Sequence, residues 1–160
     1  MKKHLLSFVV LATLFTTVLS GCSKDDDNND PGETKTQLLI KSNWKLEKVE
    51  ASIIGDVTSQ FEACEKDNTI TFAATSNDAT SGSGTLDEGP TKCDNSDPQS
   101  ASFTWELITN GTVLRTSQAL IDGGSTDFTI VSLNGTNLVL SQQMTIAPFG
   151  ATTITLTLKH

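Results

Sequence analysis

Several residue types that carry chemistry are scarce or missing in this chain of 160 residues. It contains no tyrosine, one arginine (Arg115) and two histidines, His4 and His160. Two histidines leave little material for histidine-based catalysis or for a histidine-rich metal site. Eleven basic residues stand against 19 acidic ones, which gives a formal net charge of −8. Because nucleic-acid binding needs clustered Lys and Arg, this balance argues against a nucleic-acid partner.

Sequence motifs for catalysis are missing as well. There is no glycine-rich phosphate loop, no Ser-His-Asp set and no metal-binding motif. The acid pairs Asp87/Glu88 and Glu62/Glu65 lie in expected loops, so nothing sets the separation that a glycosidase pair needs. Residues 122–127 carry two carboxylates near a flexible turn, which we interpret as a hairpin loop rather than a cation site. The sequence therefore predicts a protein that is not an enzyme and that uses no cofactor and no metal.

Residues 1–21 are typical of an export signal. Two lysines precede residues 5–19, an apolar stretch about as long as the hydrophobic region of a signal peptide and shorter than a membrane span. The stretch ends in Leu19-Ser20-Gly21-Cys22, which resembles the lipobox of bacterial lipoproteins. The resemblance implies cleavage before Cys22, diacylglycerol on its sulfur, and an acyl group such as palmitate on the new amine. Two or more acyl chains anchor a protein stably to a membrane. The alternative is a plain secretory signal with a fortuitous cysteine.

Residues 22–33 form an expected tether between the lipid and the folded domain. They are polar, acidic and nearly free of apolar side chains, so we expect them to stay disordered. Their Asp and Asn residues lack the spacing of a calcium loop. The acidic run after Cys22 also resembles the signal that sends lipoproteins to the outer face of the outer membrane in one group of Gram-negative bacteria. We therefore expect an outer-membrane lipid anchor facing the cell surface, with the periplasmic face as the alternative.

Residues 34–160 are predicted to fold as one all-β domain. A short helical turn is expected over 33–41. Strand-like runs follow at short intervals, and their expected ranges are 43–53, 68–75, 80–87, 101–109, 112–119, 125–133, 137–146 and 151–159. Two Asn-Gly pairs, at 110–111 and 134–135, are typical of tight hairpin turns with positive φ angles. Eight strands in sequential hairpins favour an eight-stranded antiparallel up-and-down barrel. A two-sheet β-sandwich is the alternative.

Alternating side chains identify the expected interior face. In the last strand Ile154 and Leu156 alternate with threonines, and Phe103 and Trp105 alternate with polar residues in a central strand. A small eight-stranded barrel is either filled by side chains or hollow enough for one small ligand. Phe103, Trp105, Ile154 and Leu156 are therefore the candidate ligand-binding residues, with a packed core as the alternative for the aromatic ones.

The two remaining cysteines, Cys64 and Cys93, are predicted to form a disulfide. Cysteines left unpaired in an exported domain usually pair with each other, because the cell envelope is oxidising. A zinc site would need further ligands, and His160 is the one histidine left after the signal. A catalytic thiol would need a base that the sequence does not supply. The bridge would fasten the loop before residues 101–109 to the segment before residues 68–75.

The domain resembles the lipocalin-like domain of small bacterial lipoproteins over residues 35–160. The elements that carry the resemblance are, in order, Trp44-Lys45-Leu46, the run from Cys64 to Phe72, Cys93, Trp105-Glu106-Leu107 and the strand from Ile154 to Leu158. The resemblance implies an eight-stranded barrel and no established reaction.

Two functions follow as hypotheses for such a protein. One is a membrane-anchored carrier that binds a small apolar or amphipathic ligand in the barrel. The other is a surface interaction or accessory module, without a ligand of its own, whose loops contact an envelope or host protein or a glycan.

Overall fold

The computed structural model describes residues 32–160. The predicted signal peptide, Cys22 and most of the predicted tether lie outside the described residues. The helical elements are α1 (Lys35–Leu39), the 3₁₀ turn η1 (Thr58–Gln60) and α2 (Ala63–Lys66). The strands are β1 (Trp44–Ala51), β2 (Gly55–Asp56), β3 (Thr69–Ala73), β4 (Ser81–Asp87), β5 (Ser100–Ile108), β6 (Val113–Thr116), β7 (Asp127–Leu133), β8 (Asn137–Ile146) and β9 (Gly150–Lys159). Within residues 32–160 no helix has the length and hydrophobicity of a membrane span.

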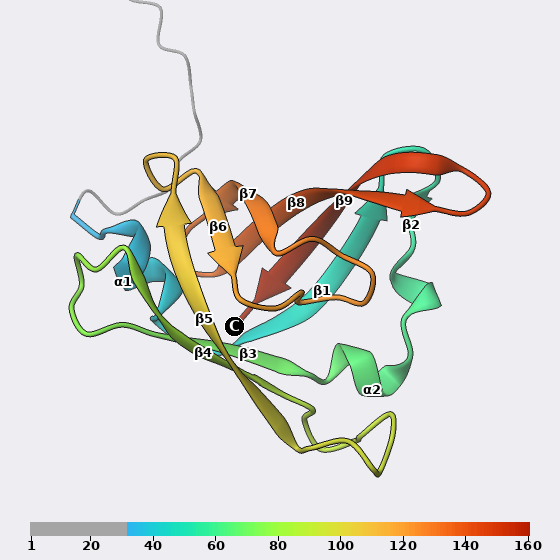
Figure 1. Cartoon of the computed structure of the whole chain (residues 1–160), viewed down its shortest axis with the longest axis horizontal. Coiled ribbons are helices and arrows are strands. Elements are labelled where there is room, and N and C mark those ends of the chain that lie inside the picture. The colour runs from blue at the N-terminus through green and yellow to red at the C-terminus, as the bar shows by residue number, and fades with distance from the viewer. Residues whose placement is uncertain (1–31) are drawn as a thin grey trace, which may run out of the picture.

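Eight antiparallel strands close into a barrel, so the predicted fold class is confirmed. Strands β3 to β9 pair in sequence order, and β1 pairs with β9 from Lys45↔Lys159 to Ala51↔Ile154. This pairing of the first and last strands closes the sheet (Figure 1), which a two-sheet sandwich does not do. The two-residue strand β2 lies outside the barrel and extends β1 as a hairpin.

One of the two predicted Asn-Gly turns does not have the expected backbone. Asn110 and Gly111 have φ angles of 56° and 74° between β5 and β6, as predicted. Asn134 and Gly135 do not have positive φ angles, so the predicted backbone conformation of this second turn is wrong. Instead, the Asn134 side chain accepts hydrogen bonds from the backbone N–H groups of Thr136 and Asn137, both 2.9 Å long. Its Oδ1 atom organises the turn without a left-handed backbone.

Helix α1 closes one end of the barrel. Thr34 caps its first turn, with reciprocal hydrogen bonds to Gln37. The Lys35 ammonium donates to the Gly111 carbonyl in the β5–β6 turn (2.9 Å), and the Thr36 hydroxyl donates to the Ala79 carbonyl before β4. Leu38 is fully buried beneath these turns. The turns that link β3 to β4, β5 to β6 and β7 to β8 all lie at this end, because the strands run alternately up and down.

Aromatic rings fill the part of the interior enclosed by β3, β4 and β5. Phe72 packs edge-to-face against Phe103, with ring centroids 5.6 Å apart, and also against Trp105. Gly82 and Gly84 of β4 lie opposite these rings, and a Cβ atom on Gly84 would overlap the Phe103 ring. The strand therefore needs glycine here so that the large rings fit inside the barrel.

The barrel widens between β1 and β3 at the end opposite α1. Only Trp44 and Lys45 of β1 pair with β3. Farther along the same edge of β1, the Val49 carbonyl accepts a hydrogen bond from the Val57 N–H, and the Val49 N–H donates one to the Thr58 hydroxyl oxygen. Both bonds are 2.9 Å long. Residues after β2 thus replace β3 beside β1, and the chain then passes through η1 and α2 across the widened end (Figure 1).

Candidate ligand-binding site

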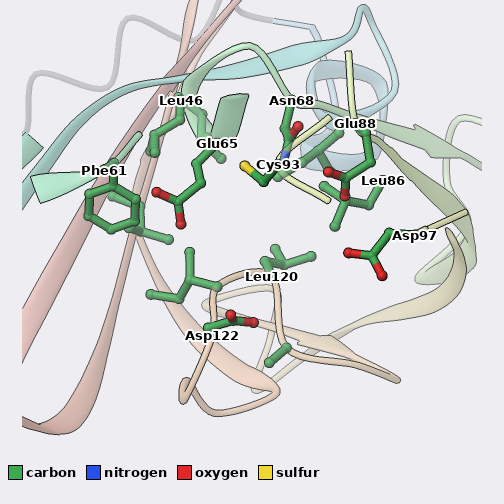
Figure 2. Close-up of a pocket in the computed structure, with 15 residues that line it drawn as sticks. Leu46, Phe61, Glu65, Asn68, Leu86, Glu88, Cys93, Asp97, Leu120 and Asp122 are labelled. Atoms are coloured by element: carbon green, nitrogen blue, oxygen red, sulfur yellow. The ribbon is translucent and has the colours of Figure 1, made fainter. Parts of the chain in front are cut away.

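A pocket of about 270 Å³ opens at the end of the barrel opposite α1. Its floor is apolar and consists of side chains from β1, β3, β4 and β9, which are Leu46, Ile70, Leu86, Leu156 and Leu158. Four carboxylates lie around this floor, from α2 (Glu65), from the two ends of the β4–β5 loop (Glu88 and Asp97) and from the β6–β7 loop (Asp122). Figure 2 shows the carboxylates of Glu65, Glu88 and Asp97 turned toward the space between α2 and the β6–β7 loop. We call this the inner pocket.

A second pocket, of about 480 Å³, adjoins the inner pocket and is more apolar. It lies between the β1–β2 hairpin, the 3₁₀ turn and the β8–β9 hairpin, with Ile54, Met144 and Phe149 in its walls. The two pockets share the side chains of Phe61, Glu65, Ile121 and Asp122. We call it the outer groove. Together the inner pocket and the outer groove form one concave, mostly apolar region that carries a few polar groups, as small-molecule sites do.

The disulfide holds the β4–β5 loop, residues 88–99, against α2 beside the inner pocket. Cys64 in α2 is bonded to Cys93 in the loop, with Cα atoms 5.3 Å apart, so the predicted pairing is confirmed. The Asn68 amide, oriented to donate, bridges the carbonyls of Glu88 (2.9 Å) and Cys64 (3.0 Å). A covalent bond and two hydrogen bonds therefore join the same two segments, and they fix one wall of the pocket.

The β4–β5 loop is also ordered by local hydrogen bonds. The Asp94 carboxylate accepts from the Ser96 backbone N–H (2.8 Å) and hydroxyl (2.7 Å), which holds the pKa of Asp94 below its ordinary value. At the base of the loop the Glu88 N–H donates to the Gln99 carbonyl (2.9 Å). These bonds stiffen the segment that carries Asp97.

Buried polar side chains hold the opposite wall, which is the β6–β7 loop of residues 117–126. The Gln142 side chain is buried on β8, and its Oε1 atom accepts a 2.7 Å hydrogen bond from the Ser125 N–H. The buried Thr116 hydroxyl donates to the Gln118 carbonyl (2.7 Å). These anchors at both ends of the loop place Leu120, Ile121 and Asp122 over the barrel opening.

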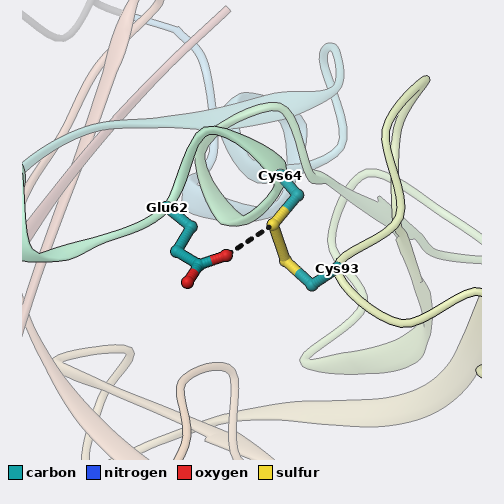
Figure 3. Close-up of side chains that lie close together, drawn as sticks. All are labelled: Glu62, Cys64 and Cys93. Carbon is teal, nitrogen blue, oxygen red and sulfur yellow. Dashed lines mark hydrogen bonds between the residues drawn. A yellow bond between two sulfur atoms is a disulfide. The ribbon is translucent and has the colours of Figure 1, made fainter.

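In the described part of the chain, one group of three residues places its potential metal-ligand atoms within 4.8 Å of one another. The three residues are Glu62, Cys64 and Cys93. The Glu62 carboxyl oxygen lies 3.6 Å from Cys64 Sγ, and Figure 3 shows these two side chains next to each other. Both sulfur atoms are joined to each other, so neither is a thiolate that binds a metal and neither has a hydrogen to donate. The group therefore offers a single carboxylate ligand and makes no metal centre.

The four residues predicted to bind a ligand lie in two different environments. Leu156 lies in the floor of the inner pocket and Ile154 in the wall of the outer groove. Phe103 and Trp105 are 3% and 2% exposed, in the aromatic cluster beneath Gly84 and Gly82, and they are not among the residues that line the two pockets. The Trp105 Nε1–H donates to the carbonyls of Ala73 (3.1 Å) and Ser83 (2.9 Å).

Several pocket residues were not among the sequence-predicted candidates. Glu65, Glu88 and Asp122 belong to segments interpreted as solvated loops, and Phe61 lies in a stretch without strand periodicity. One signal was available for the Glu65 segment. The predicted disulfide already places Cys64, and therefore its neighbours, beside the loop that contains Cys93.

Comparison with known families gives one match. The lipocalin-like domain family matches residues 40–140, which is well over half of the chain. No curated protein matches it.

Proposed function

The chain belongs to the lipocalin-like domain family, and from this premise we propose that it is a carrier that binds a small apolar or amphipathic molecule at the open end of its barrel. The observation that carries the proposal is the apolar floor of the inner pocket. Leu46, Leu86 and Leu156 line a space of about 270 Å³ that opens at this end of the barrel. Apolar surface in such an open pocket is stabilised by a ligand that covers it.

The proposal assigns no reaction to the protein. Members of the lipocalin-like family are typically binding proteins, which supports a binding role without catalysis. The residues that line the inner pocket and outer groove include carboxylates and amides but no histidine, lysine, serine or threonine. A hydroxyl or amine nucleophile activated by a histidine or lysine base is therefore absent from the lining within residues 32–160.

Titration with a neutral fluorescent probe, N-phenyl-1-naphthylamine, tests binding directly. The probe emits strongly in an apolar site, so we expect a saturable rise in fluorescence with the chain carrying Cys22→Ser, which is purified without a lipid. Ile121→Trp adds volume where the two pockets meet, and we expect it to lose most of this binding.

Val131→Trp is the matched control. Val131 is 58% exposed on the outside of the barrel, so the same enlargement there should leave probe binding unchanged. No saturable signal from the parent chain, or equal binding by both variants, would contradict the proposal.

We also propose that the carrier is anchored by lipid on Cys22 to the outer membrane, at the cell surface. The lipobox-like Leu19-Ser20-Gly21-Cys22 and the acidic run that follows it support this location. Labelled palmitate should enter the chain and should not enter the Cys22→Ser variant. Added protease should digest the protein on intact cells. Digestion only after the outer membrane is permeabilised would place the domain on the periplasmic face instead.

One observation favours the alternative, an interaction module. Two neighbouring hairpin tips expose large apolar side chains beside the outer groove: Ile54 is 43% exposed after β1, and Phe149 is 55% exposed between β8 and β9. Exposed apolar groups gathered at one place are typical of protein contacts. If Ile54→Ser/Phe149→Ser abolishes capture of an envelope protein by cross-linking and leaves probe binding unchanged, the tips serve a partner rather than a ligand.

A further inference from the structure

We infer that the inner pocket selects amphiphiles that carry a positive charge, such as an alkyl chain or apolar ring with a protonated amine. This inference rests on the proposed ligand-binding function and adds the charge of the ligand to it. The four carboxylates of Glu65, Glu88, Asp97 and Asp122 surround the apolar floor, and among the described residues no lysine, arginine or histidine lines either pocket. A ligand whose apolar part rests on the floor therefore meets four carboxylates and no lining cation at the rim.

The carboxylates at the rim also lack partners of opposite charge. Four other acids in residues 32–160 form ion pairs, and these are Glu33, Glu47, Glu50 and Asp127. None of the four acids of the inner pocket takes part in an ion pair of the described chain. Glu65 accepts one bond, from the Glu62 backbone N–H (2.6 Å), which caps α2. The Lys92 ammonium lies beside Asp97 but donates to its backbone carbonyl, not to its carboxylate. All four rim carboxylates therefore stay without an ion-pair partner, and apolar walls beside them strengthen their attraction for a cation.

The spacing of the four carboxylates favours an organic cation over a metal ion. A calcium site gathers six to eight oxygen atoms at 2.3–2.6 Å from the ion. Among the described residues the pocket acids do not form a set of three with ligand atoms within 4.8 Å of one another. They come from three segments around a space of about 270 Å³. Charges spread in this way suit a bulky ammonium group, which needs no close oxygen shell.

Three probes with the same eight-carbon chain test the inference by isothermal titration calorimetry at low salt: n-octylammonium, 1-octanol and octanoate. We expect n-octylammonium to bind at least about tenfold more tightly than octanoate, with 1-octanol between them. We expect added salt to reduce the preference, because these partly exposed charges are screened. The measurements use the chain with Cys22→Ser.

Glu65→Gln/Glu88→Gln removes two rim charges and keeps the shape of both side chains. The glutamine at 65 retains an oxygen to cap α2, so we expect the fold to persist. The control is Asp78→Asn/Glu106→Gln, which changes the net charge equally at two exposed acids outside the pocket. We expect the pocket pair to weaken n-octylammonium binding by about fivefold or more and to leave 1-octanol binding within about twofold. The control should change neither.

The outcomes separate this inference from the proposed function. If all three probes bind with equal affinity, or if octanoate binds most tightly, the charge selectivity is refuted while ligand binding stands. Equal effects of the pocket pair and the control pair on n-octylammonium also refute it, because the effect is then one of net charge. If neither these probes nor N-phenyl-1-naphthylamine binds, both the function and the selectivity fall.

Discussion

Breaking the Cys64–Cys93 disulfide should destabilise the whole domain, although one of its cysteines lies in an exposed loop. The two cysteines are 29 residues apart, so the bond closes a ring of about 30 residues. In the chain-entropy model, opening a ring of this size costs about 3–4 kcal/mol, because the unfolded chain gains freedom that the bond had removed. Folded proteins typically have a free energy of unfolding of about 5–15 kcal/mol, so this loss is a large share of the stability of the domain.

Urea unfolding followed by tryptophan fluorescence measures this loss. Trp44 and Trp105 are both buried in the core, so their emission reports unfolding of the barrel rather than of the loop. With a denaturant slope of about 1–3 kcal/mol per molar urea, the midpoint should fall by about 1–4 M. Cys22→Ser in every sample prevents exchange of thiols with a third cysteine.

A pair of variants separates the effect of the bond from that of packing. Cys93 is exposed, so Cys93→Ala breaks the bond without leaving a cavity. Cys64 is buried, so Cys64→Ala/Cys93→Ala should lose up to about 1 kcal/mol more. A loss below about 1 kcal/mol for Cys93→Ala would refute the reasoning. It would mean that residual structure already confines the unfolded chain between the two cysteines, so that opening the ring adds little freedom.

Three further predictions concern the barrel wall. Gly84→Ala should lower the free energy of unfolding by about 1–3 kcal/mol, because the new methyl group overlaps the Phe103 ring, and Phe103→Leu should recover part of the loss in the same urea assay. Trp105→Phe should lower the free energy of unfolding by about 2 kcal/mol, because two backbone carbonyls lose the indole N–H as their donor. An unchanged urea midpoint would mean that a water molecule replaces this donor. Hydrogen bonds from Arg115, 2.7 and 2.8 Å long, hold the pKa of Asp127 below its ordinary value, so Arg115→Met should raise that pKa in a carboxyl NMR titration. The Arg115–Asp127 ion pair stabilises the fold above the ordinary carboxyl pKa, and this effect is lost as the pH falls through the folded pKa of Asp127. The same Asp127 pKa in the parent protein and in Arg115→Met would contradict the prediction.

The order of the barrel strands was predictable because neighbouring strands in the chain are neighbours in the sheet. Alternation in β9 and β5 marked the interior side chains, and the order of hairpins implied closure. The region between β1 and β3 was not predictable in the same way. Elements of two to four residues, such as β2, η1 and α2, span only about one period of a hydrophobic pattern, which is too short for the pattern to be recognised. Their positions depend on bonds to β1 and to the β4–β5 loop.

The site was predicted in part, because alternation tells which face a residue is on but not how deep it lies. Phe103 and Leu156 both face inward, yet Phe103 lies in the packed aromatic cluster and Leu156 in the pocket floor. Gly82 and Gly84 were a partial indication of this difference in depth. Small residues opposite large ones indicate that side chains fill this level of the barrel interior. The carboxylates at the rim had no local pattern, because three separate segments bring them together.

The pairing of β1 with β9 also has a consequence for how the chain reaches its native state. The contacts that close the barrel join residues 45–51 to residues 154–159, so they span almost the whole domain. Contacts between such distant segments form slowly, because a long loop must be ordered before they are gained. Until β9 is in place, the edges of β1 and β8 lie open to pairing with other chains. A chain that ends before residue 150 should therefore aggregate rather than form a smaller barrel, because β1 then has no β9 to pair with.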